Sequence, residues 1–165
     1  MSSAAEMALR TASDADIGFV MSVERLPGYP ALVGTFAAGA HARAMAAPGT
    51  RYVIAEQAGR PAGFAVLRQD AERPNNVTLA RFAMAERGRG LGRAALEAIC
   101  REVFAMPGVA RIALDVLPSN LPARRLYARC GFAEEGLMRQ VLRLPDGSLA
   151  DLHLMALLRA DWSGP

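Results

Sequence analysis

Three glycines and three arginines gather in one short stretch of the chain, Arg87-Gly88-Arg89-Gly90-Leu91-Gly92-Arg93. The stretch follows a strand-like run at residues 77–84 and precedes a helix-like run at residues 93–104. Glycine lets the backbone turn tightly and approach a ligand closely, and the free N–H groups at the start of a helix attract anions. The pattern therefore predicts a loop that holds a phosphate or a pyrophosphate.

This loop differs from two other glycine-rich phosphate loops. The nucleoside-triphosphate loop ends in Gly-Lys-Ser/Thr, and the chain contains no lysine. A dinucleotide-binding loop lies in a strand–loop–helix unit with an acidic residue about twenty positions further on. Here the loop lies in mid-chain, and apolar and polar residues alternate in the strands before it, as they do in antiparallel strands. A glycine-rich turn can also be a plain connection, so a second motif is needed to assign it.

The second motif lies further along the chain, where residues 111–117 have the pattern of a strand and residues 121–129 that of a helix. Asn120 stands at the start of this helix, and Tyr127 follows seven residues later, about two turns away on the same face. A phenol, whose ordinary pKa is about 10, can protonate a leaving group. The structural alternatives are a tyrosine at the edge of the core and an asparagine that only caps the helix.

Together the two motifs resemble those of the GNAT family of N-acetyltransferases, in the form Arg87-x-x-Gly90-x-Gly92 and Asn120-x-x-Ala123-x-x-x-Tyr127-x-x-Cys130-Gly131-Phe132. The resemblance is strong over residues 77–132 and looser elsewhere. It implies that the first motif cradles the pyrophosphate of acetyl-CoA with the backbone, supported by arginine side chains, at Arg87, Gly88, Arg89, Gly90, Leu91, Gly92 and Arg93. It also implies a backbone contact to the pantetheine arm from Phe82, Ala83 and Met84, a further contact from Asn120, and a general acid at Tyr127.

The resemblance suggests Asp115 as the general base, because protein N-terminal alanine acetyltransferases of this family carry a glutamate there. A carboxylate on a strand beside the cleft can take the proton of an amine directly or through water. Asp115 could equally be the structural partner of a nearby arginine, and Glu24 is the other candidate base. One departure from the family pattern is the absence of a proline between strand 77–84 and the loop, where Ala85-Glu86 stands.

The implied fold is α/β (α+β), with a mixed, mostly antiparallel sheet of six to seven strands that splays into a V-shaped cleft between its fourth and fifth strands. About four helices flank this sheet, and residues 1–165 are expected to form a single domain. The implied reaction is transfer of an acetyl group from acetyl-CoA to a primary amine by direct attack in a ternary complex. The acceptor would be a small amine or a protein N-terminus, and the nearest branches are the ribosomal-protein and small-amine acetyltransferases. The alternative is a catalytically weak sensor that binds acyl-CoA.

The remaining elements follow from hydrophobic periodicity and turn signals. Residues 24–48 are expected to cover the acceptor pocket, and Arg139 and Asp151 to pair across a C-terminal hairpin. The predicted strands are 8–11, 52–56, 62–67, 137–144 and 149–158. The predicted helices are one that begins at the capping box Ser13-x-x-Asp16 and ends before Pro27-Gly28, and a second at 32–45.

Charge and composition exclude several other functions. The net charge of +3 comes from 19 arginines and 16 acidic residues. The arginines gather near the loop and at Arg124-Arg125 and form no stripe with aromatic residues. This distribution disfavours nucleic acid as a partner. No apolar run reaches the roughly 20 residues of a membrane span, and the N-terminus lacks a signal-peptide pattern, so a cytoplasmic protein without a membrane partner is expected. Cys100, Cys130, His41 and His153 show no metal-ligand spacing. The C-terminal hairpin is expected at an edge of the sheet, where it can pair with a second copy, so a homodimer is possible.

Overall fold

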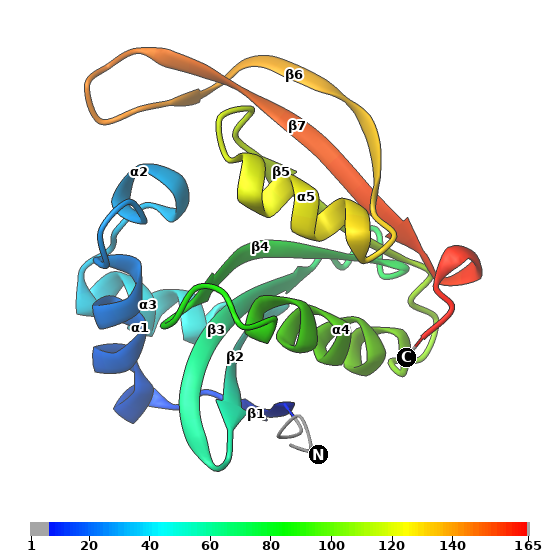
Figure 1. The fold of residues 1–165 in the computed structure, drawn as a ribbon, viewed down its shortest axis with the longest axis horizontal. Helices are drawn as coiled ribbons and strands as arrows, with labels where there is room; N and C mark the ends of the chain where they lie inside the picture. Colours follow the sequence, from blue (N-terminus) through cyan, green and yellow to red (C-terminus); the bar gives the residue numbers. More distant parts are fainter. Residues whose placement is uncertain (1–6, 165) are drawn as a thin grey trace.

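A mixed sheet of seven strands runs through the computed structural model, which describes residues 7–164. The strands are β1 (Met7–Thr11), β2 (Thr50–Gln57), β3 (Arg60–Gln69), β4 (Asn76–Met84), β5 (Arg111–Val116), β6 (Ala133–Arg143) and β7 (Leu149–Leu158). They lie in the order β1-β2-β3-β4-β5-β7-β6 (Figure 1), and all neighbours are antiparallel except β4 and β5. This confirms the predicted mixed, mostly antiparallel sheet. Residues 1–6, where no signal-peptide pattern was found, lie outside the described residues.

The sheet opens between β4 and β5, as predicted. These two strands pair in parallel only at three positions, which end at Thr78 on β4 and Ala113 on β5. Both strands continue beyond this point, β4 to Met84 and β5 to Val116. Because the strands diverge, the last part of β4 has no neighbouring strand on its β5 side within the described sheet.

A β-bulge in β4 contributes to this divergence. Val66 of β3 pairs with Arg81, but the next residue, Leu67, pairs with Leu79, so Ala80 is an extra residue in β4. A bulge bends its strand and increases the local twist. The bend lies next to the point where β4 leaves β5, and it helps to open the sheet there.

Helices cover both faces of the sheet (Figure 1). On one face, α4 (Leu91–Phe104) and α5 (Leu121–Arg129) pack their apolar sides against inward-facing residues of the central strands. On the other face lie α1 (Ile17–Glu24) and α3 (Ala38–Ala46), with the short α2 (Pro30–Val33) between them along the chain. Two short 3-10 helices complete the fold. η1 (Asp14–Asp16) leads directly into α1, and η2 (Arg159–Asp161) follows β7.

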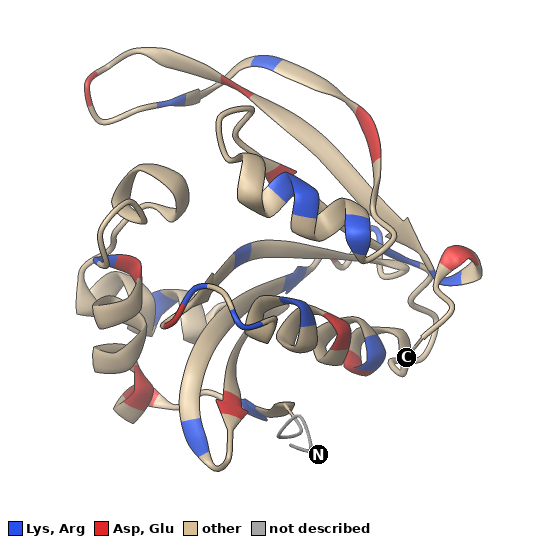
Figure 2. Ribbon diagram, viewed as in Figure 1, with Lys and Arg blue, Asp and Glu red and all other residues tan. Residues whose placement is uncertain are grey.

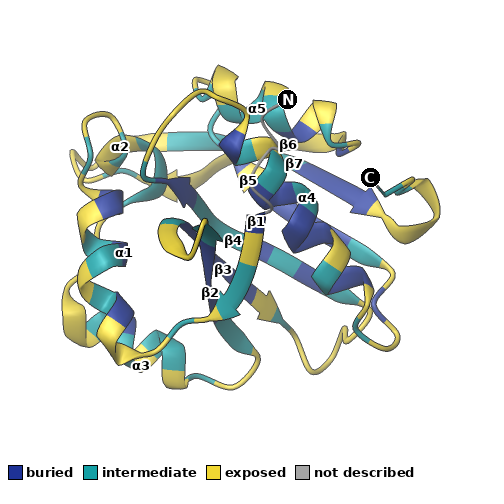
Figure 3. Cartoon of the chain, turned by 60° about the horizontal axis from the view of Figure 1, so that its bottom comes forward, coloured by how far each residue is buried: buried dark blue, intermediate teal, exposed yellow. Residues whose placement is uncertain are grey.

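Burial follows the alternation of side chains along the strands. On β2, Tyr52 and Ile54 face the core beneath α1 and α3, whereas Val53 faces the core beneath α4, because successive strand residues point to opposite faces. Figure 3 shows buried positions in the central strands and along one side of α4, with exposed positions in the turns. No helix within residues 7–164 is long and apolar enough to cross a membrane.

The predicted helix at residues 32–45 is wrong. The chain forms α2 and α3 instead, with a non-helical segment between them. Gly34 follows α2 with φ of 70° and ψ of 168°, which lies outside the helical region and is readily adopted by glycine. The apolar spacing suggested one continuous helix, and the glycine interrupts it.

The predicted capping box and the predicted C-terminal hairpin are confirmed, whereas the predicted pair of Arg139 with Asp151 is not. The capping box is present, since the backbone N–H of Ser13 donates to Asp16 at 2.8 Å. The hairpin turn is closed by Asp146, whose carboxylate accepts from the backbone N–H of Ser148 at 2.9 Å. Asp151 accepts a hydrogen bond from the backbone N–H of Gln140 at 2.7 Å, and no ion pair joins it to Arg139 in the described part of the chain.

Candidate active site

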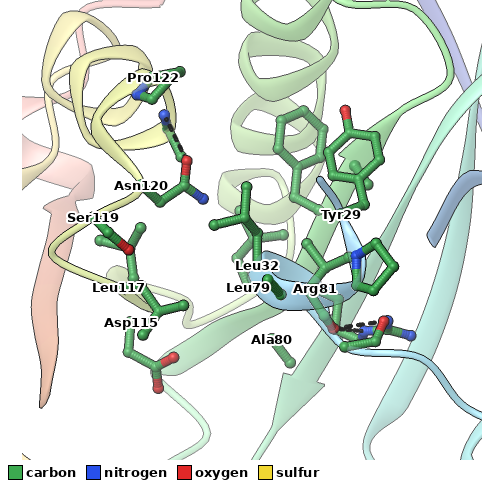
Figure 4. Close-up of a pocket in the computed structure, with 18 of the residues that line it drawn as sticks. Tyr29, Leu32, Leu79, Ala80, Arg81, Asp115, Leu117, Ser119, Asn120 and Pro122 are labelled. Atoms are coloured by element: carbon green, nitrogen blue, oxygen red, sulfur yellow. Dashed lines mark hydrogen bonds between the residues drawn. The ribbon is translucent and has the colours of Figure 1, made fainter. Parts of the chain in front are cut away.

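A cavity of about 830 Å³ lies where the sheet opens (Figure 4). Residues 29–36, which include α2, form one wall, and the exposed edge of β4 forms another. β5 and the first turns of α5 close the opposite side, and the tip of the β6–β7 hairpin reaches over the opening toward α2 (Figure 1). Residues 29–36 lie within the range that was expected to cover the acceptor pocket.

The glycine-rich loop begins at one edge of this cavity and leads into α4. Gly88, Arg89 and Gly90 adopt φ values of 86°, 56° and 74°, which is unfavourable for most residues and accounts for the two glycines. The backbone N–H groups of Gly92 and Arg93, in the first turn of α4, have no backbone acceptor among residues 7–164. A side chain added at Gly88 or Gly90 would meet no atom within 4 Å. The loop thus has free donors and open space, which fit a bound anion.

The arginine side chains of the loop are less available than its backbone. The Arg87 guanidinium stacks on the Tyr29 ring, 4.2 Å from its centroid, and donates to the backbone carbonyl of Pro27 at 3.2 Å. Arg93 turns along α4 to Glu97, at 2.7 Å. Arg89 is 76% exposed, with Glu86 at 3.8 Å. Arg89 therefore has the greatest freedom to meet an anion.

The predicted cofactor residues divide into two groups. Those that line the cavity are Phe82, Ala83, Met84, Arg87, Gly88, Gly92 and Asn120. Those that stand outside its wall are Arg89, Gly90, Leu91 and Arg93. Leu91 is buried and packs in a small cluster with Met84 and Ala95, so its side chain stabilises the start of α4.

Tyr127, within α5, and Asn120, at its N-cap, both line the cavity. Asn120 caps the helix, since its side-chain oxygen accepts from the backbone N–H of Ala123 at 3.4 Å. Tyr127 is 8% exposed and packs against Phe132, with ring centroids 5.8 Å apart. Burial, and the nearby charge of Asp115, raise the pKa of the Tyr127 phenol. The phenol therefore stays protonated at neutral pH, as a general acid requires.

Asp115 faces the cavity because of its place in β5. Its neighbours Leu114 and Val116 point into the core beneath α4 and α5, so the side chain of Asp115 points to the other face. Figure 4 shows this carboxylate on the β5 side of the pocket, across from Arg81. It has no ion-pair or hydrogen-bond partner among residues 7–164, and partial burial raises its pKa. Both features suit a base, and the alternative, a structural pairing with an arginine, is not seen among the described residues.

Glu24, the other candidate base, is fully buried. Its Oε2 accepts from Arg81 Nη2 at 2.8 Å, and its Oε1 accepts from the backbone N–H of Phe36 at 3.0 Å. Burial alone would raise the pKa of this carboxyl, but these hydrogen bonds outweigh burial and hold the pKa below its usual value. Both oxygens are engaged and the group does not line the cavity, which favours a structural role.

Arg81 is a residue of the site that sequence reasoning missed. From β4 its Nη2 donates to the backbone carbonyls of Val33 at 2.8 Å and Gly34 at 2.7 Å. The guanidinium also lies 4.7 Å from the ring centroid of Phe36. Arg81 thereby attaches the wall of residues 29–36 to the strand at the centre of the opening. The available signal was a charged residue in the middle of the otherwise apolar strand at 77–84.

Tyr29 makes a second attachment between the same wall and the same strand. Its hydroxyl donates to the backbone carbonyl of Met84 at 2.8 Å, and its ring carries the Arg87 guanidinium. The wall of the cavity is thus attached to β4 at both of its ends.

An open mixed sheet, with a glycine-rich loop and a helix N-terminus at the opening, defines the acyl-CoA N-acyltransferase fold. The chain belongs to the acetyltransferase (GNAT) family, whose model matches residues 22–132, more than half of its 165 residues. This confirms the family resemblance drawn from the two motifs.

Solved structures of several N-acetyltransferases are similar to this chain. A chimeric spermidine N-acetyltransferase from Vibrio cholerae superposes with a TM-score of 0.81 at 20% identity, covering 94% of this chain and 96% of the other. The ribosomal-protein-S18-alanine N-acetyltransferase from Escherichia coli gives 0.73 at 25% identity, over 92% and 93% of the chains. An aminoglycoside acetyltransferase in complex with coenzyme A gives 0.76 at 22% identity, over 94% and 96%.

A sequence relative among curated proteins is a kanamycin resistance protein from Rhizobium radiobacter, which is 38% identical over 60 residues. These residues are 36% of this chain and 52% of that protein. The match thus spans about half the length of the curated relative.

Replacing Glu24 should destabilise the protein strongly. In Glu24→Ala the buried Arg81 loses its carboxylate, and breaking a buried ion pair costs about 3–5 kcal/mol. Urea unfolding at neutral pH measures this loss. The matched control is Glu97→Ala, whose exposed pair with Arg93 should contribute less than about 1 kcal/mol. Equal losses in the two variants would contradict the role assigned to Glu24.

Proposed function

We propose that the protein transfers an acetyl group from acetyl-CoA to a primary amine by direct attack in a ternary complex. The observation that carries this proposal is that one cavity is lined by Tyr127 from α5, Asp115 from β5 and the free edge of β4, with the glycine-rich loop at its border. These groups come from separate parts of the chain and meet only because the sheet opens between β4 and β5.

The donor would lie along the exposed edge of β4. Its pyrophosphate would meet the free N–H groups of Gly92 and Arg93 and the open loop before them, with Arg89 nearby. Its pantetheine arm would extend past the backbone of residues 82–84, opposite Asn120. Binding energy from these remote contacts fixes the position of the thioester, which promotes reaction at a distance from the contacts themselves.

The two ionisable side chains would then move the protons of the reaction. The amine nitrogen forms a bond to the thioester carbonyl carbon, and the amine proton passes to the Asp115 carboxylate, directly or through water. The bond between that carbon and sulfur breaks, and the departing sulfur takes the Tyr127 proton. The raised pKa of Asp115 makes its carboxylate a stronger base, and the raised pKa of Tyr127 keeps its proton available.

The acceptor would enter from the side formed by residues 29–36 and the hairpin tip. We propose a small amine or the N-terminus of a protein as the acceptor, and the whole chain as a single catalytic domain. A sensor that binds acyl-CoA without turnover would keep the donor contacts and lack acetyl transfer, so activity assays separate the two functions.

Acetyl-CoA should bind the purified protein with a micromolar dissociation constant, measured by titration calorimetry. Arg89→Glu should weaken binding at least about tenfold, since it places a negative charge beside the pyrophosphate. The matched control is Arg60→Glu, at the exposed β2–β3 turn, which should leave binding unchanged. Absence of binding to a folded protein would contradict the donor site.

Tyr127→Phe should lower kcat by about 10²- to 10⁴-fold, because it removes the proton donor. The dissociation constant of acetyl-CoA should stay the same, because the ring is retained. Tyr52→Phe is the matched control, since Tyr52 is buried outside the cavity and bonds to His41. Undiminished turnover in Tyr127→Phe would exclude this residue as the acid.

Asp115→Asn should remove the acidic limb of the pH profile of kcat/KM. A base must be deprotonated, so the wild-type rate should fall as the pH drops through the pKa of Asp115. Because this pKa is raised, the limb should lie above the ordinary aspartate value of about 3.9. Asp70→Asn, in an exposed turn, should keep the wild-type profile. The acceptor amine has a limb of its own near its solution pKa, so the limb of Asp115 is the one at lower pH. If that lower limb persists in Asp115→Asn, the base is another group.

A further inference from the structure

The charges around the cavity are unsuited to a polycationic acceptor. Its lining contains four arginines and two carboxylates, namely Arg68, Arg81, Arg87, Arg143, Glu86 and Asp115. Glu86 and Arg87 belong to the donor end, which leaves Asp115 as the carboxylate of the acceptor half within residues 7–164. Figure 2 shows no continuous acidic band around the opening. An amine with several positive charges would meet more arginines than carboxylates.

Arg68 lies on the same face of the sheet as Asp115. Thr78 of β4 is paired with Arg68 of β3 on one side and with Ala113 of β5 on the other. Residues directly opposite one another across strands share a face, and Asp115 shares the face of Ala113 because it stands two residues further along. Arg68 and Ala113 are therefore separated by one strand, which corresponds to about 10 Å between their backbones. Asp115 lies two residues further along β5, past the point where β5 separates from β4, so the long side chain of Arg68 has to extend across the opening toward it.

Arg68 is also the arginine of this half with the freest charge. Arg81 is paired with Glu24, and Arg143 donates to the backbone carbonyl of Gly147 at 2.9 Å in the hairpin turn. Arg68 is exposed and has no hydrogen-bond or ion-pair partner among residues 7–164. Its guanidinium can turn to an anion in the cavity without breaking an existing contact.

Much of the remaining lining of the acceptor half is apolar. Leucines from the wall, the sheet and the hairpin line it, namely Leu32, Leu79, Leu142, Leu144 and Leu152. A ligand that fits this half would combine one amine near Asp115, an anionic group near Arg68 and an apolar body between the leucines.

We propose that the acceptor is an amino acid with an apolar side chain. Its amine would lie at Asp115 and its carboxylate at Arg68, because the two groups of an amino acid are separated by only a few bonds and can bridge side chains that project from alternate strands. A carboxylate–guanidinium contact is charge-assisted and can be bidentate. This inference rests on the proposed function and names the acceptor of that same site.

The test compares acceptors by release of coenzyme A from acetyl-CoA. Leucine should be acetylated with a kcat/KM at least about tenfold higher than that of leucinamide, which lacks the carboxylate. A tenfold difference corresponds to the loss of one charge-assisted contact. Spermidine and kanamycin should be poorer acceptors than leucine. Arg68→Gln should lower kcat/KM for leucine at least about tenfold and leave that for leucinamide nearly unchanged. The matched control is Arg60→Gln, on the same strand but away from the cavity, which should change neither.

Several results would overturn this inference and leave the proposed function standing. These are equal rates for leucine and leucinamide in the wild type, a preference for spermidine or kanamycin, or an Arg68→Gln variant that folds normally by circular dichroism and keeps the wild-type preference. The comparison of leucine with leucinamide needs no variant. If acetyl-CoA binds but leucine is not acetylated while a peptide with a free N-terminus is, the acceptor class alone is overturned. If neither the amines of this panel nor such a peptide is acetylated, the proposed transferase function is overturned as well.

Discussion

The short parallel pairing between β4 and β5 is the constraint on which the site depends. The strands pair at three positions and then separate, so backbone groups that would complete a sheet remain available along β4. Each of the other features is placed by this separation. α4 begins where β4 ends, which brings its free N–H groups to one end of the opening, and α5 begins where β5 ends, which brings Asn120 and Tyr127 to the opposite side. Alternation along β5 then directs Asp115 to the face away from the core of α4 and α5.

A buried ion pair provides the second constraint, because it fixes the wall opposite α5. Glu24 and Arg81 come from α1 and β4, and charges at such depth are tolerated when they are paired and hydrogen-bonded. Here the remaining hydrogen bonds go to Val33, Gly34 and Phe36. The same side chains thus neutralise one another and hold the segment that lines the cavity opposite α5. A general base at Glu24 would conflict with this arrangement, since its oxygens are already occupied.

Local patterns predicted most of the fold and the residues around the opening. Hydrophobic alternation located the strands, and the two motifs predicted that Tyr127, Asn120 and the glycine-rich loop lie near one another, as the structure shows. One helix was predicted where α2 and α3 are separate, because apolar spacing alone does not reveal that Gly34 ends a helix. The role of Arg81 was missed for a different reason. Its partners are carbonyls and a carboxylate 47 to 57 positions earlier in the chain, and no local pattern reports such distant contacts.

Because the wall is attached through main-chain carbonyls, its side chains can change during evolution without loss of the attachment. Arg81 contacts the carbonyl oxygens of Val33 and Gly34, and every residue type presents a carbonyl. The side chains of Pro30, Ala31 and Leu32, which line the cavity, are therefore free of the contacts that hold their segment in place. Substitutions at these positions can reshape the pocket without detaching the wall from β4. The residues that fix the wall thus differ from the residues that shape the cavity, so the shape of the cavity can change by single substitutions while the edge of β4 stays as it is.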